Sequence, residues 1–332
     1  MCENATQDGP PVSDPESLSE VPTQTFLVPS ERAGTRIDQL LAELCPEYSR
    51  SRLQSWIKQG LVEVDGASCR AKDKVRGGES VVLRTLLTEE VSDRPEAMDL
   101  DLLYEDDSLL VVNKPAGLVM HPAAGNPSGT LLNGLLHHHP QLTAIPRAGI
   151  VHRLDKETSG LLVVAKTLQA QHGLVQQLQA RSVKREYRAI VQGSMVAGGT
   201  VDKPIGRHPV NRLRMTVVER GKQAVTHYRI LQRFAAHTYL QVNLETGRTH
   251  QIRVHMSHIH HPLLGDPLYG GRQKIPPGLS DGAVEILQQF KRQALHATRL
   301  ELIHPDSGEL MSWEAPPPSD MQQLLRLLAD GD

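Results

Sequence analysis

The sequence predicts an α+β protein built from two folded units, and three observations lead to that fold class. The chain has 332 residues, which is more than one ordinary small domain needs. Acidic segments that contain proline flank a short stretch with helical and strand-like apolar spacing. In the longer stretch that follows, strand and helix patterns are interspersed without strict βαβ alternation, which favours a mixed, largely antiparallel sheet. We therefore expect a disordered acidic tail over residues 1–31, a small α/β unit over 32–94 and a larger unit over 95–332.

Composition argues against several classes of protein. No run of about 18 apolar residues occurs and no charged-then-apolar segment opens the chain, so we expect a cytoplasmic protein. The 3 cysteines show no paired spacing, which argues against a disulfide framework and a zinc ribbon. The formal net charge is only −2, yet Lys and Arg concentrate at 32–76 and 147–253. These clusters fit local basic surfaces that bind nucleic acid, and they fit equally well solvated charges around two ordinary domains.

The small unit begins with two helical patterns. Apolar residues recur at helical spacing over 36–44, and a proline follows that run. A second helix is expected from the capping residue Ser49 to Gly60, a residue type that often follows helix C-termini. The apolar alternation of 61–64 predicts a strand, and Asp65-Gly66 predicts a hairpin turn after it.

Basic residues are expected on the exposed faces of this small unit. They are Arg50, Arg52, Lys58, Arg70, Lys72, Lys74 and Arg76. The string RIDQLL…SRSRLQSWIKQGLVEVDG, which spans the two helices and the turn, resembles the S4 RNA-binding domain. The resemblance implies that the unit contacts RNA, whereas the pattern alone also fits a purely structural helix pair.

The larger unit, after an acidic linker over 84–107, is rich in strands, with helices interspersed among them. Period-two or continuous apolar runs predict strands at 108–113, 160–166, 185–192, 224–233 and 239–244. Apolar residues at helical spacing predict helices at 130–138, 168–180 and 249–258.

One loop of this unit is the candidate for catalysis. In GIVHRLDKETSGLLVVAK, residues 149–166, two glycines bracket a polar loop that leads directly into an apolar strand. Catalytic groups are often held on such a loop beside rigid structure. Asp155 lies there between Arg153 and Lys156, and neighbouring cations keep a carboxylate ionised, as a nucleophile requires. An isolated Arg-x-Asp, however, is usually a surface ion pair.

The loop is not isolated, because its neighbours form a family pattern. HRLDKETSGL strongly resembles the catalytic signature of the RluA family of pseudouridine synthases. LETGRTHQIRVHMSH and VKREYRAIVQG resemble two further blocks of that family, and other agreements extend the resemblance from Asp101 to Trp313. With the S4-like unit in front, the pattern resembles the branch of the family that modifies RNA of the large ribosomal subunit.

The resemblance implies a role for four residues. Asp155 matches the essential aspartate of the family, and Arg153 matches the arginine that enters the RNA stack where the target base has flipped out. Tyr187 matches the tyrosine that packs against the flipped uracil, and Arg253 matches the basic residue that pairs with the aspartate. From the residues alone, Tyr187 would be a core tyrosine of a strand and Arg253 a solvated charge on a helix.

The resemblance also implies the substrate. We expect 23S rRNA, free or in a pre-50S particle, to be isomerised at uridines of the stem-loop that bridges the two ribosomal subunits. We expect a monomer that requires no metal, small-molecule cofactor or membrane. The sequence is compatible with three roles for Asp155: addition to C6 of uracil, attack on C1′ of ribose, or assistance of elimination to a glycal.

Two other functions fit parts of the sequence. His137-His138-His139 and the group His258, His260 and His261 suggest a metal-dependent RNA hydrolase, although consecutive histidines on a helix point in different directions. The S4-like unit alone suggests a ribosome-assembly factor that binds rRNA without catalysis, and a complete set of Asp155, Tyr187 and Arg253 argues against that interpretation. The glycine-rich segments 125–129 and 198–199 match no phosphate-loop motif and are predicted to be turns.

Overall fold

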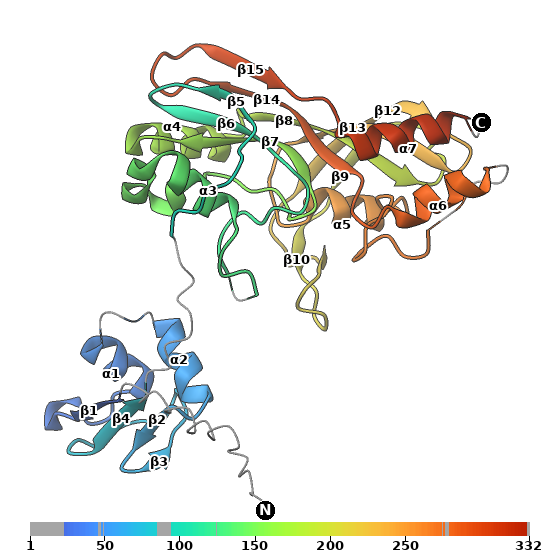
Figure 1. Ribbon diagram of the computed structural model, residues 1–332. Coiled ribbons are helices and arrows are strands. Elements are labelled where there is room, and N and C mark those ends of the chain that lie inside the picture. The colour runs from blue at the N-terminus through green and yellow to red at the C-terminus, as the bar shows by residue number, and fades with distance from the viewer. Residues whose placement is uncertain are drawn as a thin grey trace, which may run out of the picture. The chain divides into compact units, whose positions relative to one another are not determined.

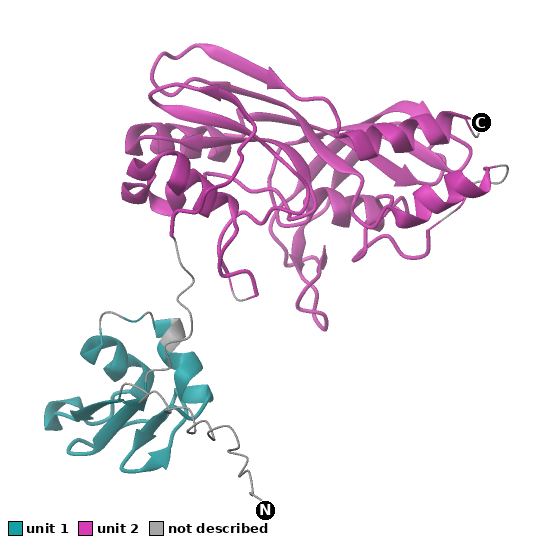
Figure 2. Ribbon diagram, in the orientation of Figure 1, with its two compact units in different colours: residues 1–90 teal, residues 91–332 magenta. Residues whose placement is uncertain are grey.

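The computed structural model consists of two compact units (Figures 1 and 2). The chain divides between them into residues 1–90 and 91–332. The structure describes residues 23–45, 48, 50–84, 94–123, 125–273, 275 and 279–330. Within these ranges, none of the helices is both long and apolar enough to span a membrane.

Unit 1 is a four-stranded antiparallel sheet against which two helices pack. The strands lie in the order β1-β4-β2-β3. Their bounds are Thr23–Leu27 for β1, Val62–Val64 for β2, Ala67–Ser68 for β3 and Ser80–Arg84 for β4. The helices are α1, Ile37–Leu44, and α2, Arg50–Lys58, and a short 3-10 turn, η1, spans Ser30–Arg32.

The helices and the hairpin of unit 1 confirm the sequence prediction. The expected inner residues of α2, Leu53, Trp56 and Ile57, are buried in one core with α1 and the sheet. Asp65 and Gly66 have φ of 49° and 76°, which is the backbone of a tight hairpin turn. Ser49, the expected helix cap, lies outside the described residues.

The predicted disordered tail over 1–31 is wrong at its C-terminal end. Thr23–Leu27 forms β1, which pairs with β4 along its whole length. Phe26 and Val28 stand two residues apart, so both face the sheet's core side, and Val28 is buried. This burial offsets the entropy cost of ordering the segment, and the acidic composition further upstream obscured the short alternation. Residues 1–22 of the predicted tail lie outside the described residues.

Unit 2 is built on one nine-stranded sheet, whose mixed pairing confirms the fold class that the sequence predicted. The order is β5-β6-β7-β14-β8-β13-β12-β9, with β15 paired to β14. Among the strand pairs that the structure describes in this sheet, only β7 and β14 run parallel. The bounds are β5 Leu102–Glu105, β6 Leu109–Lys114, β7 Ser159–Ala165, β8 Lys184–Gln192, β9 Gly199–Asp202, β12 Val225–Arg233, β13 His237–Leu244, β14 Leu295–Ile303 and β15 Leu310–Glu314. A separate hairpin joins β10, Ile205–Arg207, to β11, Met215–Val217. Because β5 is the edge strand, the linker predicted over 84–107 ends earlier than expected, and residues 85–93 of it lie outside the described residues.

Helices cover both faces of this sheet, which explains the continuous apolar runs. They are α3 Leu131–His138, α4 Leu168–Gln179, α5 Gln251–His258, α6 Asp281–Gln289 and α7 Ser319–Asp330, with 3-10 turns η2 Pro140–Ala144 and η3 Pro146–Gly149. Alternate residues of β6 and β7 enter two different cores, one shared with α3 and α5 and the other with α4. A third core lies under α6 and α7, at the end of the sheet opposite α3 and α4 (Figure 1).

Candidate active site

The register of neighbouring strands brings distant parts of the sequence together. Gly160 on β7 lies opposite Ala297 on β14, and Ala297 lies opposite Tyr187 on β8. On the other side of β8, Val242 of β13 lies opposite Tyr187, and β13 leads into α5. The loop before β7, the middle of β8 and the start of α5 therefore meet around one cavity.

Two glycines fix the ends of the loop that carries Asp155, and they are the two that bracket it in the sequence. A Cβ atom on Gly149 would lie 1.9 Å from the carbonyl oxygen of Ala165. One on Gly160 would lie 2.2 Å from the carbonyl oxygen of Ala297. Both residues also have positive φ, 77° and 112°, so only glycine fits either position.

A buried lysine holds the middle of the same loop. Lys114, at the end of β6, is fully buried, and its Nζ donates to three backbone carbonyls, of which that of Lys156 lies at 2.9 Å. Burial lowers the pKa of Lys114 to about 8, while the charges of Glu157 and Asp155 oppose that shift. Arg292 donates from Nη1 to the carbonyl of Glu157 at 3.3 Å. The backbone next to Asp155 is thus fixed from two directions.

Asp155 is paired with Arg253, which was the expected partner. Nη1 of Arg253 donates to Oδ2 of Asp155 at 3.0 Å, and the Asp155 side chain retains 16% exposure toward the cavity. The other two nitrogens of the Arg253 guanidinium donate to Asp266, Nε to Oδ2 at 2.7 Å and Nη2 to Oδ1 at 2.9 Å. Asp266 therefore fixes the plane of the guanidinium, which leaves one donor directed at Asp155.

The environment of Arg253 keeps it charged although it is buried. Burial alone would lower the pKa of Arg253, but the hydrogen bond and charge of Asp266, followed by the charge of Asp155, raise it overall. Tyr269 stacks on the guanidinium, with its ring centroid 5.0 Å from Cζ of Arg253. The backbone amides of Leu268 and Tyr269 donate to Asp266 at 2.9 and 3.0 Å, so the second carboxylate is itself fixed.

Tyr187 and His250 complete the surroundings of Asp155. Tyr187 is buried on β8, and burial raises its pKa; the charge of Asp155 adds to the rise and that of Arg185 opposes it. Nε2 of His250 lies 3.9 Å from Oδ1 of Asp155, and Nδ1 is hydrogen-bonded to the Tyr269 hydroxyl at 2.9 Å. Burial lowers the pKa of His250, so this ring is neutral at pH 7.

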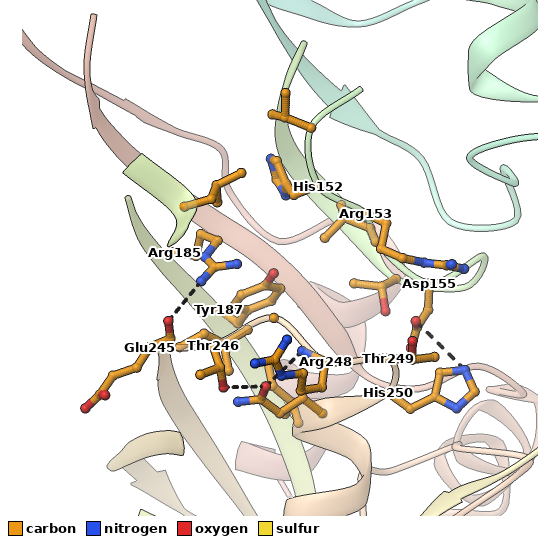
Figure 3. Close-up of a pocket in the computed structure, with 18 of the residues that line it drawn as sticks. His152, Arg153, Asp155, Arg185, Tyr187, Glu245, Thr246, Arg248, Thr249 and His250 are labelled. Atoms are coloured by element: carbon orange, nitrogen blue, oxygen red, sulfur yellow. Dashed lines mark hydrogen bonds and ion pairs between the residues drawn. The ribbon is translucent and has the colours of Figure 1, made fainter. Parts of the chain in front are cut away.

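The cavity that these residues share has a volume of about 890 Å³. Figure 3 shows Asp155 and Arg153 on one wall and Tyr187 with Arg185 on another. Its basic lining residues are Arg147, Arg153, Arg181, Arg185, Arg248 and Arg253. The side chain of Arg153 is exposed. A space of this size with convergent polar groups is typical of a substrate-binding site.

The histidines that suggested a metal site have other partners or lie apart. Nε2 of His138 is 2.8 Å from Glu105 Oε2, and Nδ1 of His261 is 2.9 Å from the carbonyl oxygen of Gln192. Within the residues that the structure describes, no three His, Cys, Asp or Glu side chains are grouped to hold a metal ion. The geometry therefore does not favour the hydrolase hypothesis.

Comparisons with known proteins agree with this geometry. Residues 108–258 match the family model described as RNA pseudouridylate synthase, and residues 35–81 match the S4 domain. A protein of Pseudomonas aeruginosa named ribosomal large subunit pseudouridine synthase D is 56% identical over 94% of this chain and 97% of its own length. The chain belongs to the RNA pseudouridine synthase family. Unit 1 contributes an S4 domain to this synthase, and unit 2 contributes the synthase domain.

Further proteins are similar to this synthase. Proteins with the same name from Xanthomonas campestris pv. campestris and Escherichia coli are 56% and 54% identical, each over 92% of this chain and over 92% and 94% of their own lengths. The solved structure titled human RNA pseudouridylate synthase domain containing 4 superposes with a TM-score of 0.51 at 28% identity, covering 69% of this chain and 92% of that one.

Sequence reasoning assigned no role to several residues that build the site. Asp266 and Tyr269 lie in the segment HPLLGDPLYGG, and their spacing gave no sign that they face Arg253. Lys114 carried a usable signal, because a lysine that directly continues an apolar strand is unusual. Arg185 carried a similar signal, as a charged residue on the same face of a strand as Tyr187.

Proposed function

We propose that this chain isomerises uridine to pseudouridine in ribosomal RNA of the large subunit, with Asp155 as the nucleophile. The observation that carries the proposal is the ion pair between Asp155 and Arg253 at 3.0 Å on the wall of a nucleotide-sized cavity that Tyr187 also lines. Arg253 orients the carboxylate, and the partial exposure of Asp155 leaves it open to a ligand.

The reaction needs one carboxylate and no net change in oxidation state. The N1–C1′ bond of uridine breaks, the uracil rotates, and a C5–C1′ bond forms; C5 loses a proton and N1 gains one. Asp155 can take part by adding to C6, by attacking C1′ or by assisting elimination to a glycal. The arrangement around Asp155 supports each of these routes, because all three place the carboxylate beside the detached uracil.

The uracil must leave the RNA stack before it reaches Asp155. Flipping costs a few kcal/mol, and the exposed guanidinium of Arg153 fits the role of filling the gap and stacking on the neighbouring bases. Tyr187 offers its ring to the flipped base, and such stacking contributes about 1–3 kcal/mol.

The substrate is proposed from the names of the relatives and from the two units. The relatives are named for the large ribosomal subunit, and we propose 23S rRNA, in the stem-loop at the intersubunit bridge, as the target. Exposed cations of unit 1 support contact with structured RNA; they are Arg50, Lys58, Arg70, Lys72, Lys74 and Arg76. The side chain of Arg52, the remaining cation of this predicted set, lies outside the described residues.

Mapping pseudouridines tests both the activity and the substrate. Total RNA from cells with and without the gene is compared at single-nucleotide resolution. We expect a small set of 23S rRNA positions to lose pseudouridine and to regain it when the gene is restored. Unchanged rRNA together with changed positions in another RNA would contradict the substrate, and no change in any RNA would contradict the activity in the cell.

Removing unit 1 should weaken RNA binding more than chemistry. A chain that begins near Pro95 keeps the core and the site of unit 2, so we expect it to fold and to retain turnover at saturating RNA. Its affinity should fall, and the slope of log affinity against log salt should shrink by roughly 0.7–0.9 for each phosphate that unit 1 no longer binds. Salt titration of binding checks this, with the full chain as the control. Unchanged affinity and slope would mean that unit 1 does not bind RNA.

A further inference from the structure

Arg185 is a buried cation on the cavity wall whose charge the fold does not neutralise. It lies on β8 with 8% of its surface exposed, and its guanidinium lines the cavity beside Tyr187 (Figure 3). Its hydrogen bond to the protein is a long one, from Nη2 to the backbone carbonyl of Glu245 at 3.4 Å, while Nε is buried without a partner. Buried arginines normally have their donors satisfied, so these unused donors need an explanation.

Among the described residues, no carboxylate oxygen lies within 4 Å of the Arg185 guanidinium to neutralise its charge. The carboxylate of Glu245 is bound elsewhere, with Oε2 3.2 Å from Arg181 and Oε1 2.7 Å from His227. The groups that do face Arg185 are neutral at pH 7. Burial, followed by the charge of Arg185, lowers the pKa of His152 to about 3, and burial raises the pKa of Tyr187.

The neighbouring loop leaves room for this guanidinium. A Cβ atom on Gly247 would lie 2.7 Å from Nη1 of Arg185, which is closer than real Cβ contacts allow. Gly247 therefore lets the backbone after β13 approach the cation closely. Strand β8 on one side and Gly247 on the other fix the position of the Arg185 guanidinium in the cavity wall.

We propose that Arg185 binds a phosphodiester group of the RNA strand that carries the target uridine. This inference rests on the proposed function, because it assumes that the cavity receives a nucleotide of RNA. A desolvated guanidinium without a counterion is best matched by an anion, and its planar fork suits phosphate oxygens. A neutral uracil carbonyl would leave the charge uncompensated.

The geometry of β8 places this phosphate site next to the base site. Arg185 and Tyr187 stand two residues apart on one face of the strand, which separates their Cα atoms by about 7 Å. Phosphodiester groups are attached to the ribose that carries the base, so a ligand whose uracil reaches Tyr187 brings an anionic group into the same cavity. The guanidinium of Arg185 then gains a counterion only when RNA is bound.

A chemical double-mutant cycle tests the assignment. The probe is a synthetic RNA stem-loop with one uridine that the enzyme modifies, prepared with a single neutral methylphosphonate at each position around that uridine. Binding is measured with full-length chains that carry Asp155→Asn, so that the RNA stays unmodified. We expect Arg185→Gln to weaken binding of unmodified RNA by about tenfold or more, as loss of a charged hydrogen bond does. One methylphosphonate position should weaken binding by a similar factor with Arg185 present and have almost no effect with Arg185→Gln.

Arg188→Gln is the matched control. Arg188 lies on the same strand but on its opposite face, where it is paired with Glu186, so this variant should leave the position-specific effect intact. Gly247→Ala, which displaces the guanidinium without removing it, should weaken the effect at the same position. Thermal melting separates a structural role, because Arg185→Gln removes an uncompensated buried charge and should not lower Tm.

The outcomes distinguish this inference from the proposed function. If every methylphosphonate weakens the two chains equally, or if Arg185→Gln lowers Tm markedly, Arg185 does not bind phosphate. A further control replaces the target uridine with 4-thiouridine. If the effect of that replacement depends on Arg185 while the effect of no methylphosphonate does, Arg185 binds the uracil and the inference is wrong. The parent chain's turnover on unmodified RNA is measured separately, and failure there would contradict the proposed function itself.

Discussion

Asp155→Asn should reduce pseudouridine formation by at least about 10⁴-fold, as removal of a nucleophile does in other enzymes, while RNA affinity stays nearly unchanged. Asparagine keeps the size of the side chain and still offers one oxygen to Nη1 of Arg253, so the loop held by Gly149 and Gly160 has no reason to move. The amide, however, is not nucleophilic. Single-turnover kinetics at saturating RNA measure the loss, and an equilibrium binding titration measures the affinity.

Arg153→Ala provides the contrasting variant. It keeps the carboxylate and removes an exposed guanidinium, so it should slow modification of a stacked uridine more than that of a uridine in a flexible loop. Turnover by Asp155→Asn within tenfold of the parent would exclude the nucleophile role. Equal losses by Arg153→Ala on both substrates would contradict its role in base flipping.

Local patterns in the sequence predict five strands and three helices of unit 2, and they miss the other described strands as well as α6 and α7. The runs at 108–113, 160–166 and 185–192 became β6, β7 and β8 within one residue at each end, because apolar periodicity reports burial directly. The strand Leu295–Ile303 was not predicted. This strand contains His, Thr, Arg and Glu among its apolar residues, so it shows no clear apolar pattern. The structure tolerates such polar side chains because neighbours bind them: His296, for example, is hydrogen-bonded to Ser159 and to the carbonyl of Ala315.

The missing strand limits what sequence reasoning can say about the site. β14 lies between β7 and β8, so without it the loop of Asp155 cannot be placed next to Tyr187. Only the family resemblance paired Arg253 with Asp155, because its helical position alone predicted a solvated charge. The partnership with Asp266 depends on the path of the chain after α5, and no local pattern encodes that path.

Arg253→Lys should reduce turnover at saturating RNA by about 10²-fold, because small displacements of a catalytic group carry costs of that order. Arg253 serves two carboxylates at once, with Nε and Nη2 on Asp266 and Nη1 on Asp155. A single ammonium cannot reproduce this fork. The side chain of Asp266 is fully buried, so its charge requires a partner more than that of Asp155 does. The lysine should therefore pair with Asp266 and leave Asp155 without an oriented partner.

Asp266→Asn separates orientation from charge in this cluster. It retains Arg253 and its contact with Asp155 but removes the charge that fixes the guanidinium plane, so we expect a smaller loss of turnover than with Arg253→Lys. RNA affinity should change little in either variant, because the Arg253 side chain is only 7% exposed and its donors already have partners. Single-turnover rates and binding titrations are measured for both variants, and urea unfolding checks that each is folded. If Arg253→Lys keeps turnover within threefold of the parent while folded, a point charge near Asp155 is sufficient, and the fork held by Asp266 has no part in positioning the nucleophile.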